Sequence, residues 1–399
     1  MPADGARGKG PLSLVDDELA SCVSCGLCLP HCPTFRVTGD ESRSPRGRIT
    51  AMRAVEAGAL EVDDPFIESM TTCIQCRGCE TACPSGVPFG HLMSDTRIAL
   101  AGRTVSTPVA FGYRLLASPL LVRSASLAAA VGQRLGIVPS ARLGLPSRLP
   151  IRRPRLAASG DDVWVFTGCV MDAWQRDVHV ALARLVESTG RGVALPGRGG
   201  GCCGALAAHG GLEGEARRRA ESTMASMPGD APIVVDSAGC GAALLEYGDL
   251  LGSEAAQHFS ARVIDASQWL AAHIEELPQP HDGHVRPVVA VQDPCHLRHV
   301  QHAHLPVRDL LAPYADTVEL DDDGLCCGAG GAFSVSQPEL ADEVRSRKLA
   351  SIARSGAPRT VSANPGCLEH LRRAGIVVDH PVTVVAAAVG VIEEDGRVR

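Results

Sequence analysis

Two stretches near the start of the chain share one cysteine pattern: residues 22–33 read CVSCGLCLPHCP, and residues 73–84 read CIQCRGCETACP. Each stretch separates its cysteines by two, two and three residues, and a proline follows the fourth cysteine. Gaps of two residues let one tight loop direct three thiolates to the same place, whereas the fourth thiolate lies beyond a longer gap. The proline then turns the chain away, because its ring fixes the backbone. Eight cysteines in this pattern predict metal binding in the first 83 residues.

The spacing is that of bacterial iron–sulfur proteins with two clusters, in which the fourth cysteine of each run ligates the other cluster. The pattern therefore predicts two [4Fe–4S] clusters. The first would take Cys22, Cys25, Cys28 and Cys83, and the second would take Cys73, Cys76, Cys79 and Cys32. Zinc is the alternative, since Cys-x2-Cys pairs also build closed tetrahedral zinc sites. Two identical runs that each end in proline favour iron and sulfur.

The composition is that of a globular protein from a reducing compartment. The 399 residues are 45% hydrophobic and 21% charged, so the chain is long enough for several domains with buried cores. A net charge of −7 argues against a nucleic-acid partner. Sixteen cysteines without a secretory signal point to metal, and no stretch of about 18 apolar residues predicts a membrane span. We expect a cytoplasmic protein, with peripheral attachment to the inner face of the plasma membrane left open.

The other eight cysteines lie in two similar segments of the second half of the chain. Both segments alternate short apolar strands with helical patterns, which predicts a duplicated α/β unit. The residues between the two N-terminal cysteine runs instead have helical spacing, beginning at Ser44-Pro45. We therefore expect a multidomain protein in which an α-helical ferredoxin domain precedes two duplicated α/β Cys-Cys-Gly domains. The expected parts are residues 1–103, a connector at 104–160, and the two α/β domains at 161–283 and 284–399.

The Cys-Cys-Gly segments are candidates for further metal centres. Adjacent cysteines cannot easily close a relaxed disulfide, but both can reach one cluster if the following glycine lets the backbone approach closely. A segment without metal, with a structural role only, is the alternative. His209 and His296 lie near these cysteines in the sequence, either as ligands or proton relays or as structural residues. The candidate ligands are Cys169, Cys202, Cys203 and Cys240 in the first segment, and Cys295, Cys326, Cys327 and Cys367 in the second.

The connector region is strongly basic. Residues 96–160 contain ten arginines and no acidic residue, and prolines interrupt their apolar runs. A basic amphipathic surface of this kind can lie on an anionic membrane or on an acidic partner. Helices that pack on the neighbouring domains with their arginines in solvent are the other interpretation. The chain has 36 arginines and two lysines, so arginine is its usual cation and both interpretations stay open.

Together, these motifs resemble a known family. The Cys-Cys-Gly segments are similar to the cysteine-rich domains of heterodisulfide reductase, and the chain as a whole resembles the iron–sulfur subunits of glycolate oxidase. It is also similar to the iron–sulfur subunits of lactate and anaerobic glycerol-3-phosphate dehydrogenases. The motifs that carry the resemblance are Ser44-Pro45-Arg46-Gly47-Arg48, Asp293-Pro294-Cys295-His296 and Asn364-Pro365-Gly366-Cys367.

The resemblance implies an electron-transfer subunit of an oxidoreductase, with no catalytic residue of its own. An FAD-binding dehydrogenase subunit would oxidise a 2-hydroxy acid of the glycolate or lactate type. The clusters would then pass single electrons toward quinone or another membrane acceptor. The alternative is a heterodisulfide-reductase-like catalytic subunit that acts on a thiol, disulfide or quinone. Those reductases close each segment with Cys-x-x-Cys, whereas Ser237 and Asn364 occupy the first of these positions here, which excludes five thiolates in either segment.

Overall fold

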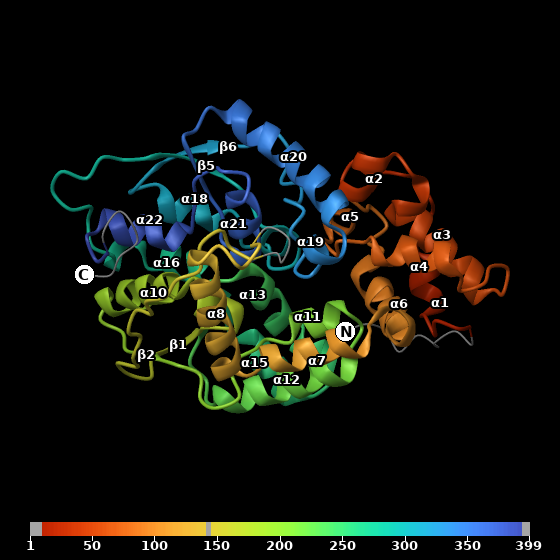
Figure 1. Ribbon diagram of the computed structural model, residues 1–399, viewed down its shortest axis with the longest axis horizontal. Coiled ribbons are helices and arrows are strands. Elements are labelled where there is room, and N and C mark those ends of the chain that lie inside the picture. Colours follow the sequence, from red (N-terminus) through yellow and green to blue (C-terminus); the bar gives the residue numbers. More distant parts are fainter. Residues whose placement is uncertain (1–9, 141–144, 393–399) are drawn as a thin grey trace.

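The computed structural model describes residues 10–140 and 145–392. Most of the N-terminal stretch that shows no secretory signal therefore lies outside the described residues, as does Arg142 of the connector. The chain runs from a helical N-terminal module, through two connector helices, into two α/β units that lie side by side (Figure 1).

The N-terminal module is built of short helices around the two cysteine loops. The helix predicted at Ser44-Pro45 is confirmed: the Ser44 hydroxyl accepts a hydrogen bond from the Gly47 amide at 2.9 Å, and Met52 and Val55 are fully buried. The next helix begins in the same way, since the Asp63 carboxylate accepts from the Phe66 amide at 2.9 Å. The elements are α1 Asp16–Ala20, α2 Pro33–Thr38, the 3₁₀ helix η1 Glu41–Arg43, α3 Pro45–Glu56, α4 Asp64–Thr71, α5 Gly78–Thr81 and α6 Phe89–Thr104.

The two α/β units each contain a four-stranded parallel sheet, and the strand order is the same in both. The orders are β2-β1-β3-β4 and β6-β5-β7-β8, which is the signature of a duplication. The first sheet consists of β1 Val163–Phe166, β2 Val193–Ala194, β3 Ile233–Val235 and β4 Val263–Asp265. The second consists of β5 Val288–Val291, β6 Asp316–Glu319, β7 Arg359–Val361 and β8 Val378–Asp379.

Helices connect successive parallel strands, because such strands need crossovers. The first unit has α9 Val170–Trp174, α10 Arg176–Ser188, α11 Ala205–His209, α12 Glu213–Ser226, α13 Ala238–Leu245, α14 Tyr247–Leu251, α15 Glu254–Ala261, α16 Ala266–Ala272 and the 3₁₀ helix η2 Ile274–Glu276. The second has α17 Cys295–His299, α18 Pro306–Leu311, α19 Phe333–Ser336, α20 Pro338–Ser355, α21 Pro365–Arg372 and α22 Pro381–Ala388. Helices α10 and α16 of the first unit pack on α22 of the second, so one apolar core joins the two sheets.

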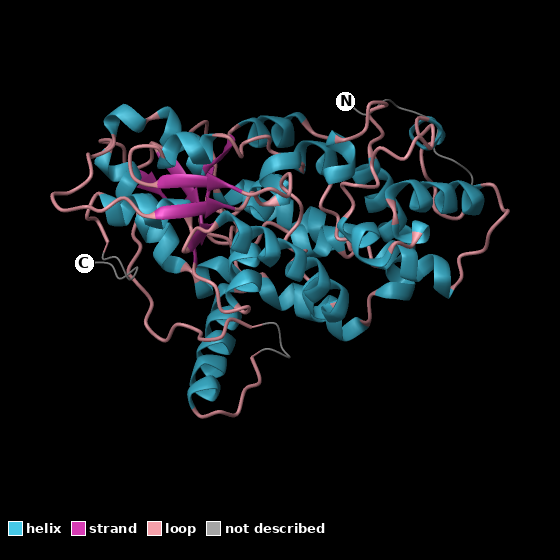
Figure 2. Ribbon diagram, turned by 90° about the horizontal axis from the view of Figure 1, so that it is seen from above, coloured by secondary structure: helices cyan, strands magenta, loops and turns pink. Residues whose placement is uncertain are grey.

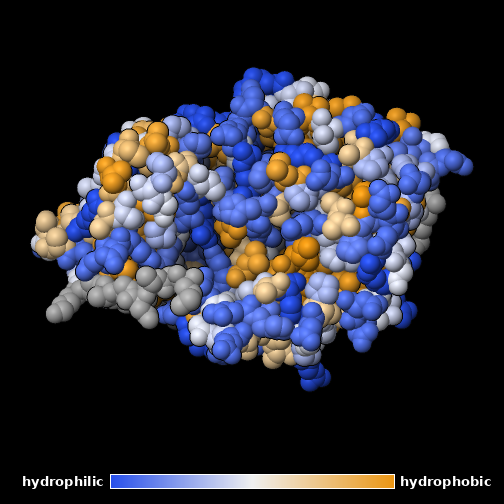
Figure 3. Space-filling model, turned by 180° about the vertical axis from the view of Figure 1, so that it is seen from behind, coloured by the Kyte–Doolittle hydropathy of each residue, from blue (hydrophilic) through white to orange (hydrophobic). Residues whose placement is uncertain are grey.

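Two helices link the N-terminal module to the first α/β unit. Pro108 lies in the first turn of α7, Thr107–Leu116, and Pro119 is the first residue of α8, Pro119–Arg134, so both prolines open helices rather than break them. Figure 2 shows α8 projecting from the body of the molecule. No single described helix has the length and apolar composition of a membrane span, although α7 and α8, bent by 103°, meet the test as a pair. On the face opposite that of Figure 1, apolar side chains form small groups among hydrophilic ones (Figure 3).

Candidate metal centres

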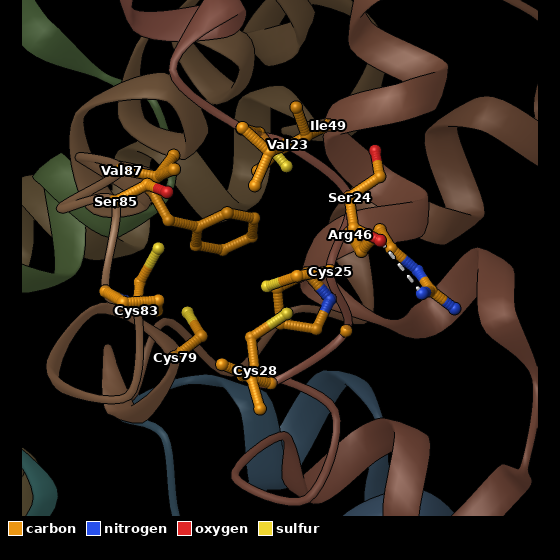
Figure 4. A pocket seen from close by; sticks show the side chains of 16 residues that line it. Val23, Ser24, Cys25, Cys28, Arg46, Ile49, Cys79, Cys83, Ser85 and Val87 are labelled. Atoms are coloured by element: carbon orange, nitrogen blue, oxygen red, sulfur yellow. Dashed lines mark hydrogen bonds between the residues drawn. The ribbon is translucent and has the colours of Figure 1, made fainter.

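The first candidate centre is a small pocket between the loop that follows α1 and the loop that follows α5. Cys22, Cys25 and Cys28 line it from the first loop, and Cys83 lines it from the second. Figure 4 shows the Cys25, Cys28 and Cys83 side chains around the same hollow. The structure thus brings three thiols of the first run together with the last thiol of the second run.

The second candidate centre is a small neighbouring pocket. Cys73, Cys76 and Cys79 of the second run line it together with Cys32, the last cysteine of the first run. Phe89 and Cys79 border both pockets, so the two hollows share a wall. The two runs therefore exchange their proline-flanked cysteines in space.

The cysteine loops are tightly curled. Ser24, Gln75 and Arg77 have φ values of 57°, 59° and 61°, a left-handed conformation that residues other than glycine rarely adopt. This curl brings the Gln75 amide within 3.4 Å of the Cys73 sulfur, so that a backbone N–H faces a thiol. Burial raises the pKa of Cys79 well above its ordinary value. A thiolate there needs a metal cation beside it, because the surroundings alone disfavour the charge.

The two arginines of the Ser-Pro-Arg-Gly-Arg motif have different surroundings. The Arg48 side chain is 1% exposed and donates hydrogen bonds to the carbonyl oxygens of Ser69 at 2.8 Å and Arg43 at 2.6 Å. Its Nη1 also lies 4.0 Å from the Cys32 sulfur, and no carboxylate of the described residues forms an ion pair with it. Arg46 lies nearer the surface, where it pairs with Glu41 at 2.8 Å. Arg48 is therefore a buried cation beside the second pocket.

The first Cys-Cys-Gly unit gathers its four cysteines at the ends of strands β1 and β3 and in the loop after β2. The sulfurs of Cys203 and Cys240 are 3.3 Å apart. The Cys169 thiol hydrogen-bonds Cys202 and lowers the pKa of Cys202 to about 7. The Ser237 hydroxyl hydrogen-bonds the Cys240 thiol.

The second Cys-Cys-Gly unit repeats this arrangement with deeper burial. Cys326, Cys327 and Cys367 are all buried, and hydrogen bonds link Cys295 to Cys326 and Cys327 to Cys367. The Asn364 amide nitrogen lies 3.4 Å from the Cys367 sulfur.

Gly328, the glycine of the second Cys-Cys-Gly segment, allows the backbone to approach the cysteine sulfurs closely. Gly328 has a φ of 90°, and a Cβ there would lie 2.6 Å from the Ala341 carbonyl oxygen. Its amide is 3.4 Å from the Cys326 sulfur, so backbone again faces a thiol.

The second Cys-Cys-Gly unit adjoins the N-terminal module. Cys76 and Cys295 pack against the same apolar cluster, which contains Ile74, Cys326 and Phe333. The second pocket and the thiols of the second unit therefore share one apolar environment.

The two histidines left open by the sequence lie at the same junction. The His296 ring nitrogen Nε2 donates to the Gln75 carbonyl oxygen at 3.0 Å, and the Gln75 side chain donates to the His209 carbonyl oxygen at 3.0 Å. The two imidazole rings meet edge to face, with centroids 5.5 Å apart. These contacts fit a structural role for both histidines.

The donor chemistry of these sites fits iron and sulfur. Thiols are soft ligands, which select zinc, copper(I) or iron–sulfur clusters over harder ions. Within residues 10–140 and 145–392, no three His, Cys, Asp or Glu side chains meet in the arrangement that a single metal ion takes. The first two sets instead surround hollows between two loops.

Comparisons with known proteins agree with this chemistry. Residues 18–87 match the family of 4Fe-4S dicluster domains, and residues 163–245 and 289–372 each match a cysteine-rich domain family. The chain is 32% identical to the "Probable glycolate oxidase iron-sulfur subunit" of Bacillus subtilis, over 90% of this chain and 89% of the relative. It is 30% identical to the glycolate oxidase iron-sulfur subunit of Escherichia coli, over 94% and 95%.

A more distant relative is a subunit of the dihydromethanophenazine:CoB--CoM heterodisulfide reductase of Methanosarcina barkeri, at 27% identity over 94% of each chain. All three relatives are components of oxidoreductases. The two relatives at 30% identity or more extend over nearly the whole chain, so this protein belongs to the family of glycolate oxidase iron–sulfur subunits.

Proposed function

We propose that this chain is the electron-transfer subunit of a flavin-dependent 2-hydroxy-acid dehydrogenase of the glycolate or lactate type. An FAD-binding partner subunit oxidises the hydroxy acid, and this chain carries the electrons onward toward quinone or another membrane acceptor. The four-part division at residues 1–103, 104–160, 161–283 and 284–399 belongs to the same proposal. It is supported by the family membership and by the all-thiol donor sets.

One observation carries the proposal: Cys32 faces the second pocket and Cys83 faces the first. This exchange is the ligand pattern of two-cluster iron–sulfur proteins, and it supports two [4Fe–4S] centres with a common wall. When bound, each centre supplies a one-electron carrier whose potential depends on burial, charge and hydrogen bonds to sulfur. Two carriers side by side suit a flavin that releases two electrons one at a time.

The residues around the second pocket influence the redox potential of a bound centre. Arg48 brings a buried positive charge 4.0 Å from the Cys32 sulfur, and the Thr34 hydroxyl lies 3.2 Å from the same atom. The Gln75 amide faces Cys73. Arg48 and the Gln75 amide favour the more negative state of a bound centre, because a positive charge or an N–H dipole stabilises added negative charge. The Thr34 hydroxyl instead donates to the Arg43 carbonyl oxygen at 2.8 Å.

The onward route leads to the second Cys-Cys-Gly unit. Cys295 packs against the same apolar cluster as Cys76, and His296 hydrogen-bonds the loop that carries Cys76. We propose that further clusters occupy the two Cys-Cys-Gly units, each with four thiols. Ser237 and Asn364 stand where a fifth thiolate would be needed for a heterodisulfide-reductase site, so the catalytic alternative has less support.

The test is anaerobic co-purification of the full chain with its flavoprotein from the native host. We expect a brown complex with about eight iron atoms per chain, or more if the Cys-Cys-Gly units are loaded. Glycolate or lactate should bleach the iron–sulfur absorbance only when the flavoprotein is present. A colourless protein with stoichiometric zinc would contradict the proposal, as would reduction by the hydroxy acid without the flavoprotein.

A further inference from the structure

Helix α8 carries an apolar stripe that no other part of the described structure covers. Leu120, Leu127, Val131 and Leu135 follow one another at spacings of seven, four and four residues, which places them on one face of the helix. All four are exposed, with Leu120 at 75% and Leu135 at 67%. Val122 and Ala130 lie on other faces of α8 and are buried, and the helix packs on α9 of the first α/β unit, where the Trp174 indole donates to the Ser126 hydroxyl at 3.0 Å. One side of α8 is therefore held against the first α/β unit, and the other side is exposed to solvent.

The C-terminal end of α8 and the turn that follows it form an apolar tip, which hydrogen bonds hold in place. The chain turns after α8 at the outermost part of the projection in Figure 2, and Ile137 in this turn is 72% exposed. The Gln133 side chain holds the turn, since it donates to the Pro146 carbonyl oxygen and accepts from the Leu149 amide, both at 2.8 Å. The Arg134 guanidinium donates to the Leu149 carbonyl oxygen at 3.2 Å. The exposed leucine and isoleucine thus project from an ordered element.

Positive charge surrounds the stripe. Residues 96–160 hold ten arginines and no acidic residue, in a chain whose net charge is −7. Arg134 and Arg148 are exposed near the tip, and Arg152 is exposed next to Arg153 along the chain; no carboxylate of the described residues forms an ion pair with any of the three. At the base of α8, Arg123, Arg153 and Arg176 share the single carboxylate of Asp172, which leaves positive charge in excess there. Positive charge in excess of its acidic partners therefore lies at both ends of α8, next to the exposed apolar residues.

We propose that the α7–α8 pair docks on an anionic phospholipid membrane, with the α8 stripe and tip in the interfacial layer and the arginines at the headgroups. A convex projection with aliphatic residues on one face, flanked by arginines without acids, is the pattern of an interfacial helix. A protein partner would need a matching groove, and acidic residues within the patch would be expected to complement it. The 103° bend between α7 and α8 suits a helix pair that lies on the surface rather than one that crosses it. The patch is separate from the thiol sites, so its test does not depend on electron transfer.

The test is sedimentation of the purified holoprotein with vesicles of phosphatidylcholine, alone or with about one quarter phosphatidylglycerol. We expect binding to the anionic vesicles only, with loss of binding at high salt. Leu135→Glu combined with Ile137→Glu should lower the partition coefficient at least about tenfold. The matched control is Val285→Glu combined with Val377→Glu, two exposed valines of the second α/β unit, which should leave binding unchanged.

A charge series tests the electrostatic part. Arg148→Ala combined with Arg152→Ala should weaken binding about fivefold for each arginine removed. Arg36→Ala combined with Arg347→Ala, which removes two exposed arginines far along the chain from the connector, should have little effect. Equal binding to neutral and anionic vesicles, or no binding at all, would overturn the proposal. So would tip variants that keep full vesicle binding but no longer bind the flavoprotein, because the patch would then be a protein interface.

Discussion

Replacing Arg48 with methionine tests the role of the buried cation beside the second pocket. Methionine keeps much of the side-chain volume but removes the charge and its hydrogen bonds. The guanidinium has no carboxylate partner among the described residues, so a bound cluster at the second pocket would be its main counter-charge. Removing it should make the second centre harder to reduce and lower its potential, because reduction adds a negative charge.

The size of the shift follows from the geometry. Two unit charges about 4 Å apart interact by about 4 kcal/mol at an effective dielectric constant of about 20, and by about 2 kcal/mol at about 8 Å. The distance between Arg48 Nη1 and the Cys32 sulfur is 4.0 Å, and the charge of a cluster is spread beyond that atom. With about 59 mV per factor of ten for one electron, the expected fall is roughly 90–170 mV.

Redox titration monitored by electron paramagnetic resonance measures this shift for each centre. Arg46→Met is the matched control: Arg46 is partly exposed and paired with Glu41, so the first centre should move by less than about 30 mV. Arg48→Lys keeps the charge and should restore most of the potential. Arg48 does not tune the second centre if Arg48→Met leaves that centre within about 30 mV of its original potential, or shifts the first centre more than the second.

Three further changes test other parts of the structure. Cys76→Ser should remove about four iron atoms and one resonance signal without altering the circular dichroism of the α/β units; an unchanged iron content would contradict the ligand assignment. Gly328→Ala should lower the free energy of unfolding by about 1–3 kcal/mol, because its φ is 90° and a Cβ would lie 2.6 Å from the Ala341 carbonyl oxygen. Gly356→Ala, with a φ of 69° but open space, should cost about 1 kcal/mol in the same urea titration, and equal losses would argue against the clash. Burial raises the pKa of Asp265 to about 7, so its carboxyl ionises in the unfolded chain before it does in the folded one. The wild-type stability should therefore fall as pH rises toward 7, and Asp265→Asn should gain about 1–2 kcal/mol relative to it between pH 6 and pH 8; a pH-independent difference would contradict this.

The sequence predicts well those features that depend on neighbouring residues. The helix start at Ser44-Pro45 follows from capping chemistry, and strands β1, β3 and β5 follow from apolar runs. The strands β2 and β8 are two residues long, too short to show any alternation, and they exist because they pair with a longer neighbour.

The environment of Arg48 could not be predicted in the same way. Its neighbours come from separate segments around Arg43, Ser69 and Thr72, so its burial is a property of the fold. From the sequence alone, Arg46 and Arg48 are equally good candidates for a positive charge beside a cluster. Only the packing shows that Arg46 forms an ion pair near the surface and that Arg48 is a buried cation. The apolar stripe of α8 is visible as spacing, but whether a neighbour covers it depends equally on the fold.

The two Cys-Cys-Gly units are similar in fold, but their contacts with the rest of the chain differ. The segments around Ser237 and Asn364 contact each other. The Ala238 amide donates to the Ala363 carbonyl oxygen at 3.0 Å, and the Gly239 amide donates to the Asn364 side chain at 3.1 Å. The N-terminal module, however, packs its second cysteine loop against Cys295 of the second unit. The same loop also contacts the first unit through Gln75 and the His209 carbonyl oxygen, but there it meets backbone rather than a cysteine. Electrons that leave the second pocket would therefore meet the thiols of the second unit first. A fold with two similar halves thus acquires a direction, because the second cysteine loop shares an apolar cluster with Cys295 and Cys326 of one half.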